Sequence, residues 1–96
     1  MALLEMRSPQ AVIDAIEEFD RLGRHVFLKK YGFGYARQYY LEYKGKRYDS
    51  KAIVGVAHGY EFPDRGQLHS SDFSGGKATV KRKLEELGFT VKVLLG

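Results

Sequence analysis

The stretch YYLEYKGKRYDSKAIVG, residues Tyr39–Gly55, predicts a β-hairpin that runs directly into a helix. Every second residue from Tyr39 to Tyr43 falls on one face, which is the period of a strand. The first 13 residues of this stretch hold four tyrosines and four cations. This concentration of aromatic and positive side chains around one turn is the first feature that requires a functional explanation.

The charges around the turn favour one of two tight hairpin registers. A turn at Gly45-Lys46 would place like charges opposite each other, with Lys44 facing Arg47. A turn at Lys44-Gly45 instead places Glu42 opposite Arg47. Cross-strand pairs contribute roughly 0.2–1 kcal/mol each, so the second register is predicted.

Hydrophobic spacing on either side of the hairpin predicts the other elements. Helices are expected over residues 8–23, 24–32, 49–60 and 76–88, and a closing strand over residues 89–96. The order is helix, helix, strand, strand, helix, helix, strand (ααββααβ). We therefore expect a single α+β domain over residues 1–96, with four helices packed on a small, mostly antiparallel three-stranded sheet.

Several expectations concern individual positions in these helices. Val26 is expected to point inward, and Tyr60 is placed on the buried stripe of the third helix. Asp49 or Ser50 is expected to cap that helix. A glycine inside a helix costs about 1 kcal/mol relative to alanine, so Gly55 implies close approach of a strand or another helix.

The charge is concentrated in the middle of the chain. The net charge is +4, with −2 in residues 1–28, +5 in residues 29–60 and +1 in residues 61–96. Such an asymmetry is typical of a polyanionic partner such as nucleic acid, although a basic surface without a ligand is the alternative.

Composition excludes several other classes. With no cysteine, the chain has neither disulfides nor a thiolate metal site. The sequence lacks an apolar run of membrane-spanning length and a signal peptide, so we expect a cytoplasmic protein without a membrane partner.

The first candidate site is the hairpin turn with the following helix start. It comprises Lys44, Lys46, Arg47, Ser50 and Lys51. A turn can present cations to phosphates, and free amides at a helix start favour an anion. The alternative is that these lysines protect a sheet edge from aggregation.

The second candidate is the glycine-rich start of the fourth helix, with Ser74, Gly75, Gly76, Lys77 and Lys81. Glycines let backbone amides approach a phosphate closely, and a hydroxyl and lysines stand beside them. The stretch lacks the complete GxxxxGK[ST] pattern of a nucleotide-binding loop. An ordinary capped helix start, with its cations solvated or paired to glutamates, is the alternative.

The third candidate is YGFGYARQYY, residues 31–40, from which Arg37, Tyr39 and Tyr40 are assigned to groove or base contacts. Exposed rings can stack on bases or form a cage for a flipped base. In a domain without tryptophan, however, such rings also serve the core.

The sequence indicates a non-catalytic chain that needs no cofactor. His25, His58 and His69 do not have the spacing of a metal site. The chain also lacks a paired-carboxylate motif, a nucleophile elbow and a nuclease signature. A hydrolase would require a pocket with perturbed titrating groups, which is not expected.

Two stretches carry a family resemblance: YDSKAIVGVAHG, residues 48–59, and DFSGGKATVKRKLEELGF, residues 72–89. Over about residues 11–91 the chain resembles the N-terminal head domain of ScoMcrA-like modification-dependent (type IV) restriction endonucleases. In that family the head precedes modules that read modified DNA and a final HNH nuclease domain. The HNH motif is absent here, so the resemblance implies a DNA-binding part without the cutting part.

Together these observations predict a double-stranded DNA-binding head that serves the C-terminal nuclease domains of the same polypeptide. Reading of a modified base, such as methylated cytosine, is the more specific expectation. The alternative is a protein-interaction or dimerisation module that orients a nuclease domain, marked by an exposed apolar patch.

Overall fold

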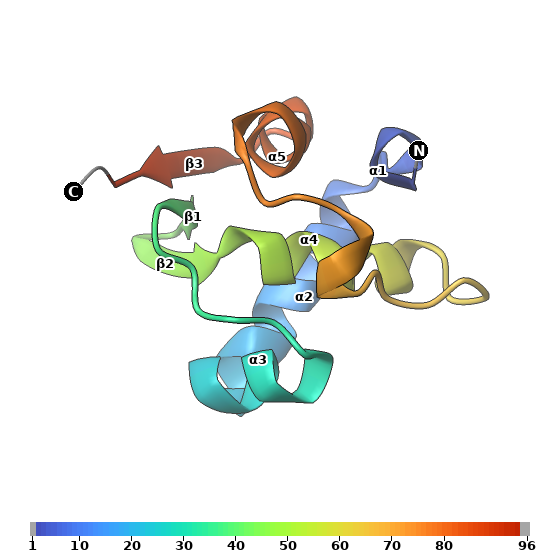
Figure 1. The fold of residues 1–96 in the computed structure, drawn as a ribbon, viewed down its shortest axis with the longest axis horizontal. Helices are drawn as coiled ribbons and strands as arrows, with labels where there is room; N and C mark the ends of the chain where they lie inside the picture. The colour runs from blue at the N-terminus through green and yellow to red at the C-terminus, as the bar shows by residue number, and fades with distance from the viewer. Residues whose placement is uncertain (1, 95–96) are drawn as a thin grey trace.

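The structure, a computed structural model, describes residues 2–94, except for the side chains of residues 2, 77 and 78. In chain order the elements are α1 (Ala2–Glu5), α2 (Pro9–Leu22), α3 (Arg24–Tyr31), β1 (Tyr39–Tyr43), β2 (Lys46–Asp49), α4 (Ser50–Glu61), a 3₁₀ turn η1 (Ser70–Asp72), a π-helical turn η2 (Lys77–Lys81), α5 (Arg82–Glu86) and β3 (Thr90–Val93) (Figure 1). The strands form one antiparallel sheet in the order β2-β1-β3. The predicted α+β class and element order are confirmed.

Helix α2 begins and ends where local signals predict. The Ser8 side chain accepts a hydrogen bond from the Ala11 amide at 3.1 Å, and Pro9 occupies the first helical position. Gly23 ends the helix with a φ of +87°, and its amide donates to the Phe19 carbonyl at 2.8 Å. A capping oxygen, an N-terminal proline and a C-terminal glycine together define the boundaries.

The hairpin adopts the register that charge pairing favoured. Glu42 faces Arg47, and the turn falls at Lys44 and Gly45. Both turn residues have positive φ, +51° and +79°, as in the tight turn whose twist matches paired strands. Because β3 pairs with the other edge of β1, β1 becomes the central strand.

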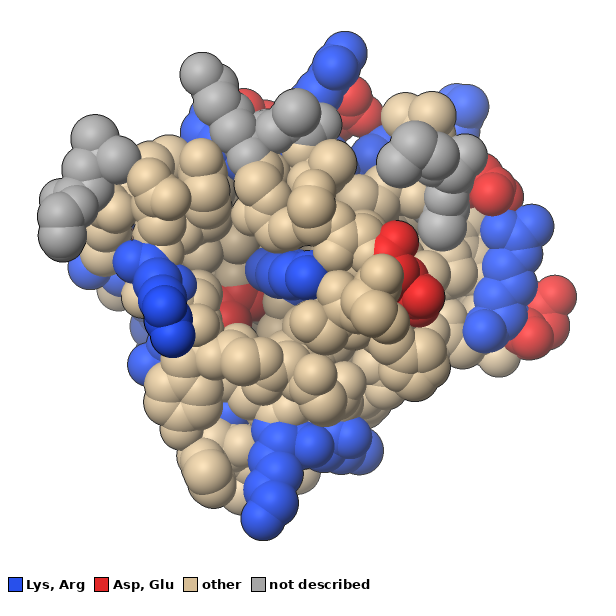
Figure 2. Space-filling model, in the orientation of Figure 1, with Lys and Arg blue, Asp and Glu red and all other residues tan. Residues whose placement is uncertain are grey.

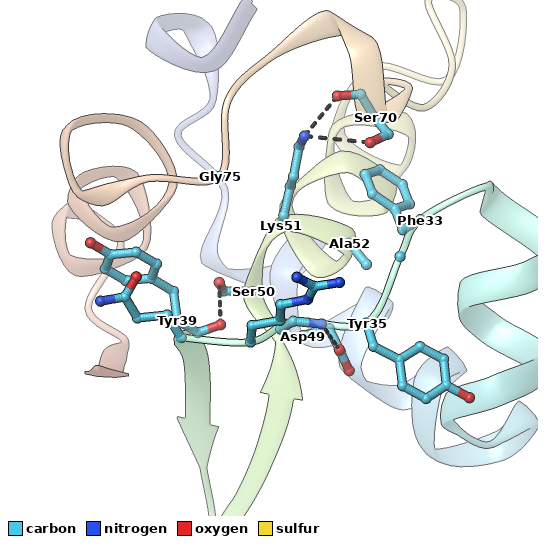
Figure 3. Close-up of a pocket in the computed structure, with 13 residues that line it drawn as sticks. Phe33, Tyr35, Tyr39, Asp49, Ser50, Lys51, Ala52, Ser70 and Gly75 are labelled. Carbon is cyan, nitrogen blue, oxygen red and sulfur yellow. Dashed lines mark hydrogen bonds between the residues drawn. The ribbon is translucent and has the colours of Figure 1, made fainter. Parts of the chain in front are cut away.

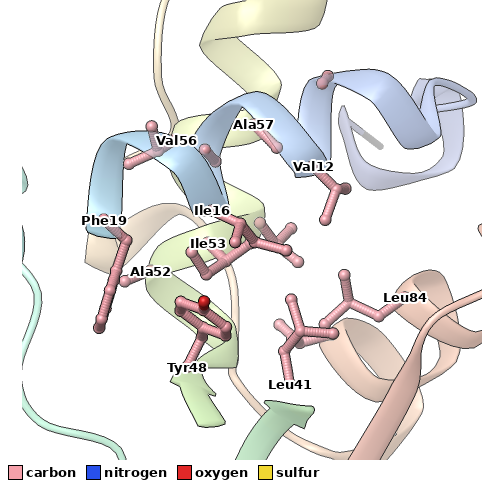
Figure 4. Close-up of a cluster of buried hydrophobic side chains, with 14 of the residues drawn as sticks. Val12, Ile16, Phe19, Leu41, Tyr48, Ala52, Ile53, Val56, Ala57 and Leu84 are labelled. Carbon is pink, nitrogen blue, oxygen red and sulfur yellow. The ribbon is translucent and has the colours of Figure 1, made fainter. Parts of the chain in front are cut away.

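The core lies between the helices and the sheet (Figure 4). Val12 and Ile16 from α2 meet Ile53 from α4, while Leu41 from β1 and Leu84 from α5 close the cluster from the other side. All five side chains are buried. Helix α4 is therefore held by α2 and by the hairpin, which fixes the position of its first turn.

Gly55 shows the close approach that its position in a helix implied. A Cβ atom built there would lie 2.5 Å from Cζ of Phe33 and 2.9 Å from the Leu68 carbonyl oxygen. The Leu68 amide also donates to the Gly55 carbonyl at 3.0 Å. The neighbours come from loops, not from the strand or helix that was expected.

Two local expectations were wrong, and a third element, the fourth helix, is present but differs in its first turn. Val26 is 51% exposed, because α3 turns Phe27 and Leu28 inward and Val26 lies about 200° around the helix from Leu28. Tyr60 is 42% exposed, although its hydroxyl reaches the buried Glu18 carboxylate. The fourth helix is divided, with the wider turn η2 preceding the regular turns of α5.

Glu18 forms a buried polar centre that ties α2 to α3 and α4. Its side chain accepts hydrogen bonds from Lys30 Nζ at 2.8 Å, the Tyr31 hydroxyl at 2.6 Å and the Tyr60 hydroxyl at 2.7 Å. Burial raises the pKa of Glu18, but these hydrogen bonds outweigh it, so the net pKa is lowered. The ionised carboxylate is thus favoured by folding.

Substitution of Gly55 by alanine should destabilise the protein. Overpacking costs about 1–3 kcal/mol and exceeds the gain of about 1 kcal/mol in helix propensity. Gly34→Ala is the control, because nothing lies within 4 Å of the position that a Cβ atom would take there and its φ is not positive. Urea denaturation should show a lower midpoint for Gly55→Ala only. A Gly55→Ala protein more stable than the wild type would contradict the proposed packing.

Glu18 should contribute to acid unfolding. Because its pKa is lower in the folded state than the usual 4.5, its contribution is present above that pH and is lost as the pH falls below it. Glu18→Gln should therefore lower stability near neutral pH and flatten the loss of stability between about pH 5 and pH 3. The exposed Glu17→Gln is the control. The free energy of unfolding is measured by denaturation at several pH values. If it falls as steeply with decreasing pH in Glu18→Gln as in the wild type, this role is refuted.

Candidate nucleic-acid interface

The carboxylate of Asp49 attaches the loop between α3 and β1 to the start of α4. It accepts two hydrogen bonds from Arg24, at 2.9 and 2.8 Å, and one from the Ala36 amide at 2.7 Å. The Asp49 side chain is 4% exposed. The hydrogen bond to Asp49 raises the pKa of Arg24, as expected for a two-pronged ion pair.

This arrangement leaves the first turn of α4 without a side-chain cap. Asp49 occupies the N-cap position, but its side chain makes no capping hydrogen bond. The Ser50 hydroxyl donates instead to the Tyr39 carbonyl at 2.9 Å. The predicted capping by Asp49 or Ser50 is therefore wrong, because both side chains bind the neighbouring loop and strand.

Lys51 connects the α4 start to the segment that precedes α5. Its Nζ donates to the Ser70 carbonyl at 2.7 Å and lies 5.1 Å from the centre of the Phe73 ring. A Cβ atom at Gly75 would lie 3.1 Å from Cδ of Lys51, so the glycine backbone packs on the lysine stem. The first and second candidate sites therefore touch each other, through the contact between Lys51 and Gly75.

These segments surround a hollow of about 330 Å³ (Figure 3). It is lined by Phe33, Gly34, Tyr35, Ala36, Arg37, Gln38, Tyr39, Asp49, Ser50, Lys51, Ala52, Ser70 and Gly75. Figure 2 shows a face that is hollowed near its centre, with a blue and a red side chain inside the hollow and mostly tan side chains along its rim. The structure brings together Arg37 and Tyr39 from the third candidate, Ser50 and Lys51 from the first, and Gly75 from the second.

The hairpin tip forms a separate basic area. Lys44, Lys46 and Arg47 are exposed there. Lys46 Nζ lies 3.9 Å from a carboxylate oxygen of Asp20, in a loose, solvent-exposed pair. Strand β2 separates Lys46 from Asp49 by three residues, or about 10 Å. The tip and the hollow are therefore distinct but adjacent along β2.

Four other predicted site residues, Tyr40, Ser74, Gly76 and Lys81, do not line the hollow. The exposed Ser74 hydroxyl is 3.2 Å from the Thr79 hydroxyl, in the turn that also contains Gly76. Lys81 pairs with Glu85 at 2.8 Å, which was the alternative interpretation for that cation. The Tyr40 hydroxyl donates to the Ala36 carbonyl at 2.7 Å. The side chain of Lys77 lies outside the described residues.

Sequence reasoning missed the supporting role of Arg24 and assigned Asp49 only to capping. Arg24 is 25 residues from Asp49 in the chain, and no local spacing signal relates them. Phe33 belongs to the aromatic stretch of the third candidate. Neither the hydrophobic periodicity nor a motif predicted that its ring packs against Gly55. These contacts arise from tertiary packing.

The histidines serve local contacts in the structure. His25 Nδ1 lies 2.9 Å from the Tyr35 hydroxyl, and His58 Nδ1 lies 2.8 Å from the Gly66 carbonyl. Within residues 2–94, no three potential ligands gather in a way that could hold a metal ion. The helices described there are also too short or too polar to cross a membrane.

Comparison with known proteins agrees with this architecture. The chain matches the family described as "ScoMcrA-like, N-terminal head domain" over residues 6–93. It is also similar to the solved structure of the Type IV phosphorothioation-dependent restriction endonuclease ScoMcrA, with a TM-score of 0.62 and 29% sequence identity. That similarity covers 94% of this chain but only 13% of the length of ScoMcrA. No curated protein matches the chain. Because the family match spans nearly every residue, the chain belongs to the ScoMcrA-like N-terminal head domains.

Proposed function

We propose that this domain is a non-catalytic, double-stranded DNA-binding head that serves the nuclease domains of a modification-dependent restriction endonuclease. The observation that carries the proposal is the hollow at the α4 start, where Arg37 and Lys51 from two separate segments lie around one concave surface. Membership of the head-domain family supports a place in DNA restriction.

The hairpin tip supplies the second part of the proposed interface. Lys44, Lys46 and Arg47 are exposed at the end of the sheet, where they can approach phosphates, since the pair of Lys46 with Asp20 is loose and solvent-exposed. Phosphate contacts position a protein on DNA without reading its sequence. We therefore assign affinity to the tip, and any selectivity to the hollow with Arg37 and Tyr39.

The second function, a protein-interaction module, has less support. It requires a contiguous exposed apolar patch. Among the described residues, the exposed large hydrophobic side chains are Leu4, Val26, Tyr35 and Tyr60. They come from four separate segments, and single exposed apolar residues are normal on soluble domains.

DNA affinity should fall with salt and depend on the hairpin tip. Replacing Lys46 and Arg47 together with alanine should weaken binding to all duplexes and reduce the slope of log affinity against log salt by about 2. Lys29→Ala, an exposed cation on α3, is the control for a simple loss of charge. Fluorescence anisotropy at several salt concentrations measures both quantities. Affinity that does not weaken between about 50 and 200 mM salt would sink the proposal.

The more specific proposal, reading of a modification, predicts unequal affinities. One duplex is prepared unmodified and with methylcytosine, hydroxymethylcytosine, methyladenine or a phosphorothioate, and binding is compared at one salt concentration. We expect one modified duplex to bind more tightly than the unmodified one. Equal affinities would limit the function to general DNA attachment.

A further inference from the structure

We propose that the hollow at the α4 start receives one nucleotide turned out of a DNA strand, an inference that rests on the proposed DNA-binding function. The hollow measures about 330 Å³, which is near the lower end of ligand pockets and far too small for a duplex. An intact duplex would contact only its rim. A single base with its sugar and phosphate is the DNA unit that fits inside.

The lining of the hollow combines two kinds of side chain, aromatic rings and cations, which match the base and the phosphate of a nucleotide. Figure 3 shows the rings of Phe33 and Tyr39 on opposite sides of it, with Lys51 between them. Aromatic faces stack on bases of any sequence. The cations Lys51 and Arg37 suit the phosphate that accompanies the base.

The charge in the hollow favours an anionic ligand. Arg24 neutralises Asp49, the acidic residue of the lining, through two hydrogen bonds. Arg37, in contrast, is exposed and forms no ion pair with any residue within the described part of the chain. A positive side chain that pairs with none of the described acidic residues therefore remains at the hollow, where it can meet a phosphate.

The ring that a base would meet is Tyr39. Tyr35 is already occupied, since Arg24 lies 4.4 Å from its ring centre and His25 contacts its hydroxyl. Figure 3 shows the Tyr35 ring directed away from the hollow. Tyr39 is partly buried at the start of β1, and its carbonyl is held by Ser50, so the ring is presented from a fixed backbone.

Base extrusion predicts a preference for weakened base pairs, because unpairing costs least at a mismatch. The 96-residue chain is titrated with two duplexes that carry 2-aminopurine at one position, either paired with thymine or mismatched. We expect tighter binding of the mismatched duplex, on the order of tenfold, and a rise in 2-aminopurine fluorescence as the base leaves the stack. Arg37→Ala and Tyr39→Leu should each remove most of this preference.

The hairpin variant Lys46→Ala/Arg47→Ala is the matched control. It should weaken binding to both duplexes equally and leave the preference intact. Salt-dependent but equal binding of the two duplexes, with unchanged fluorescence, would overturn the nucleotide pocket while DNA binding stands. Absence of binding to either duplex would overturn both proposals.

A direct titration gives an independent readout. Addition of a deoxynucleoside monophosphate should shift the backbone amide NMR signals of residues 33–39 and 50–52. The matching nucleoside and inorganic phosphate should each cause smaller shifts. Equal shifts from inorganic phosphate alone would show a simple anion site and contradict the proposal.

Discussion

The ion pair between Arg24 and Asp49 is the interaction on which the candidate interface depends. It joins the start of α3 to the end of β2, and Asp49 also accepts the Ala36 amide. Truncating Arg24 would leave the Asp49 carboxylate buried without its charged partner, which costs far more than the pair contributes. The pair holds the loop against α4 and diverts Asp49 from capping. Both effects together create a hollow beside an open helix start.

Local signals predicted a large part of the fold. Opposite charges at Glu42 and Arg47 selected the hairpin register, and the structure has that register. Ser8, Pro9 and Gly23 defined α2 by signals that act within one helical turn. Such features can be predicted from the sequence because each depends on residues that are close together in the chain.

The site was predicted residue by residue but not as one arrangement. Arg37, Lys51 and Gly75 were assigned to three separate stretches, and only tertiary packing places them around one hollow. The loop that carries Phe33 packs against α4 at Gly55. The hydrophobic periodicity of the sequence does not indicate this contact. Lys81 was expected at the same interface, but its side chain forms an ion pair with Glu85, one helical turn away. Long-range contacts thus decided which candidates belong together.

The proposed DNA interface comprises two adjacent areas, the hairpin tip and the hollow, which strand β2 connects. Mapping of backbone amide NMR shifts on addition of a short duplex tests this claim most directly. We expect the shifted signals to cluster in residues 33–39, 44–52 and 75, with little change along the outer face of α2. Shifts confined to α1, α2 and α3, or none at concentrations that saturate nonspecific binding, would contradict it.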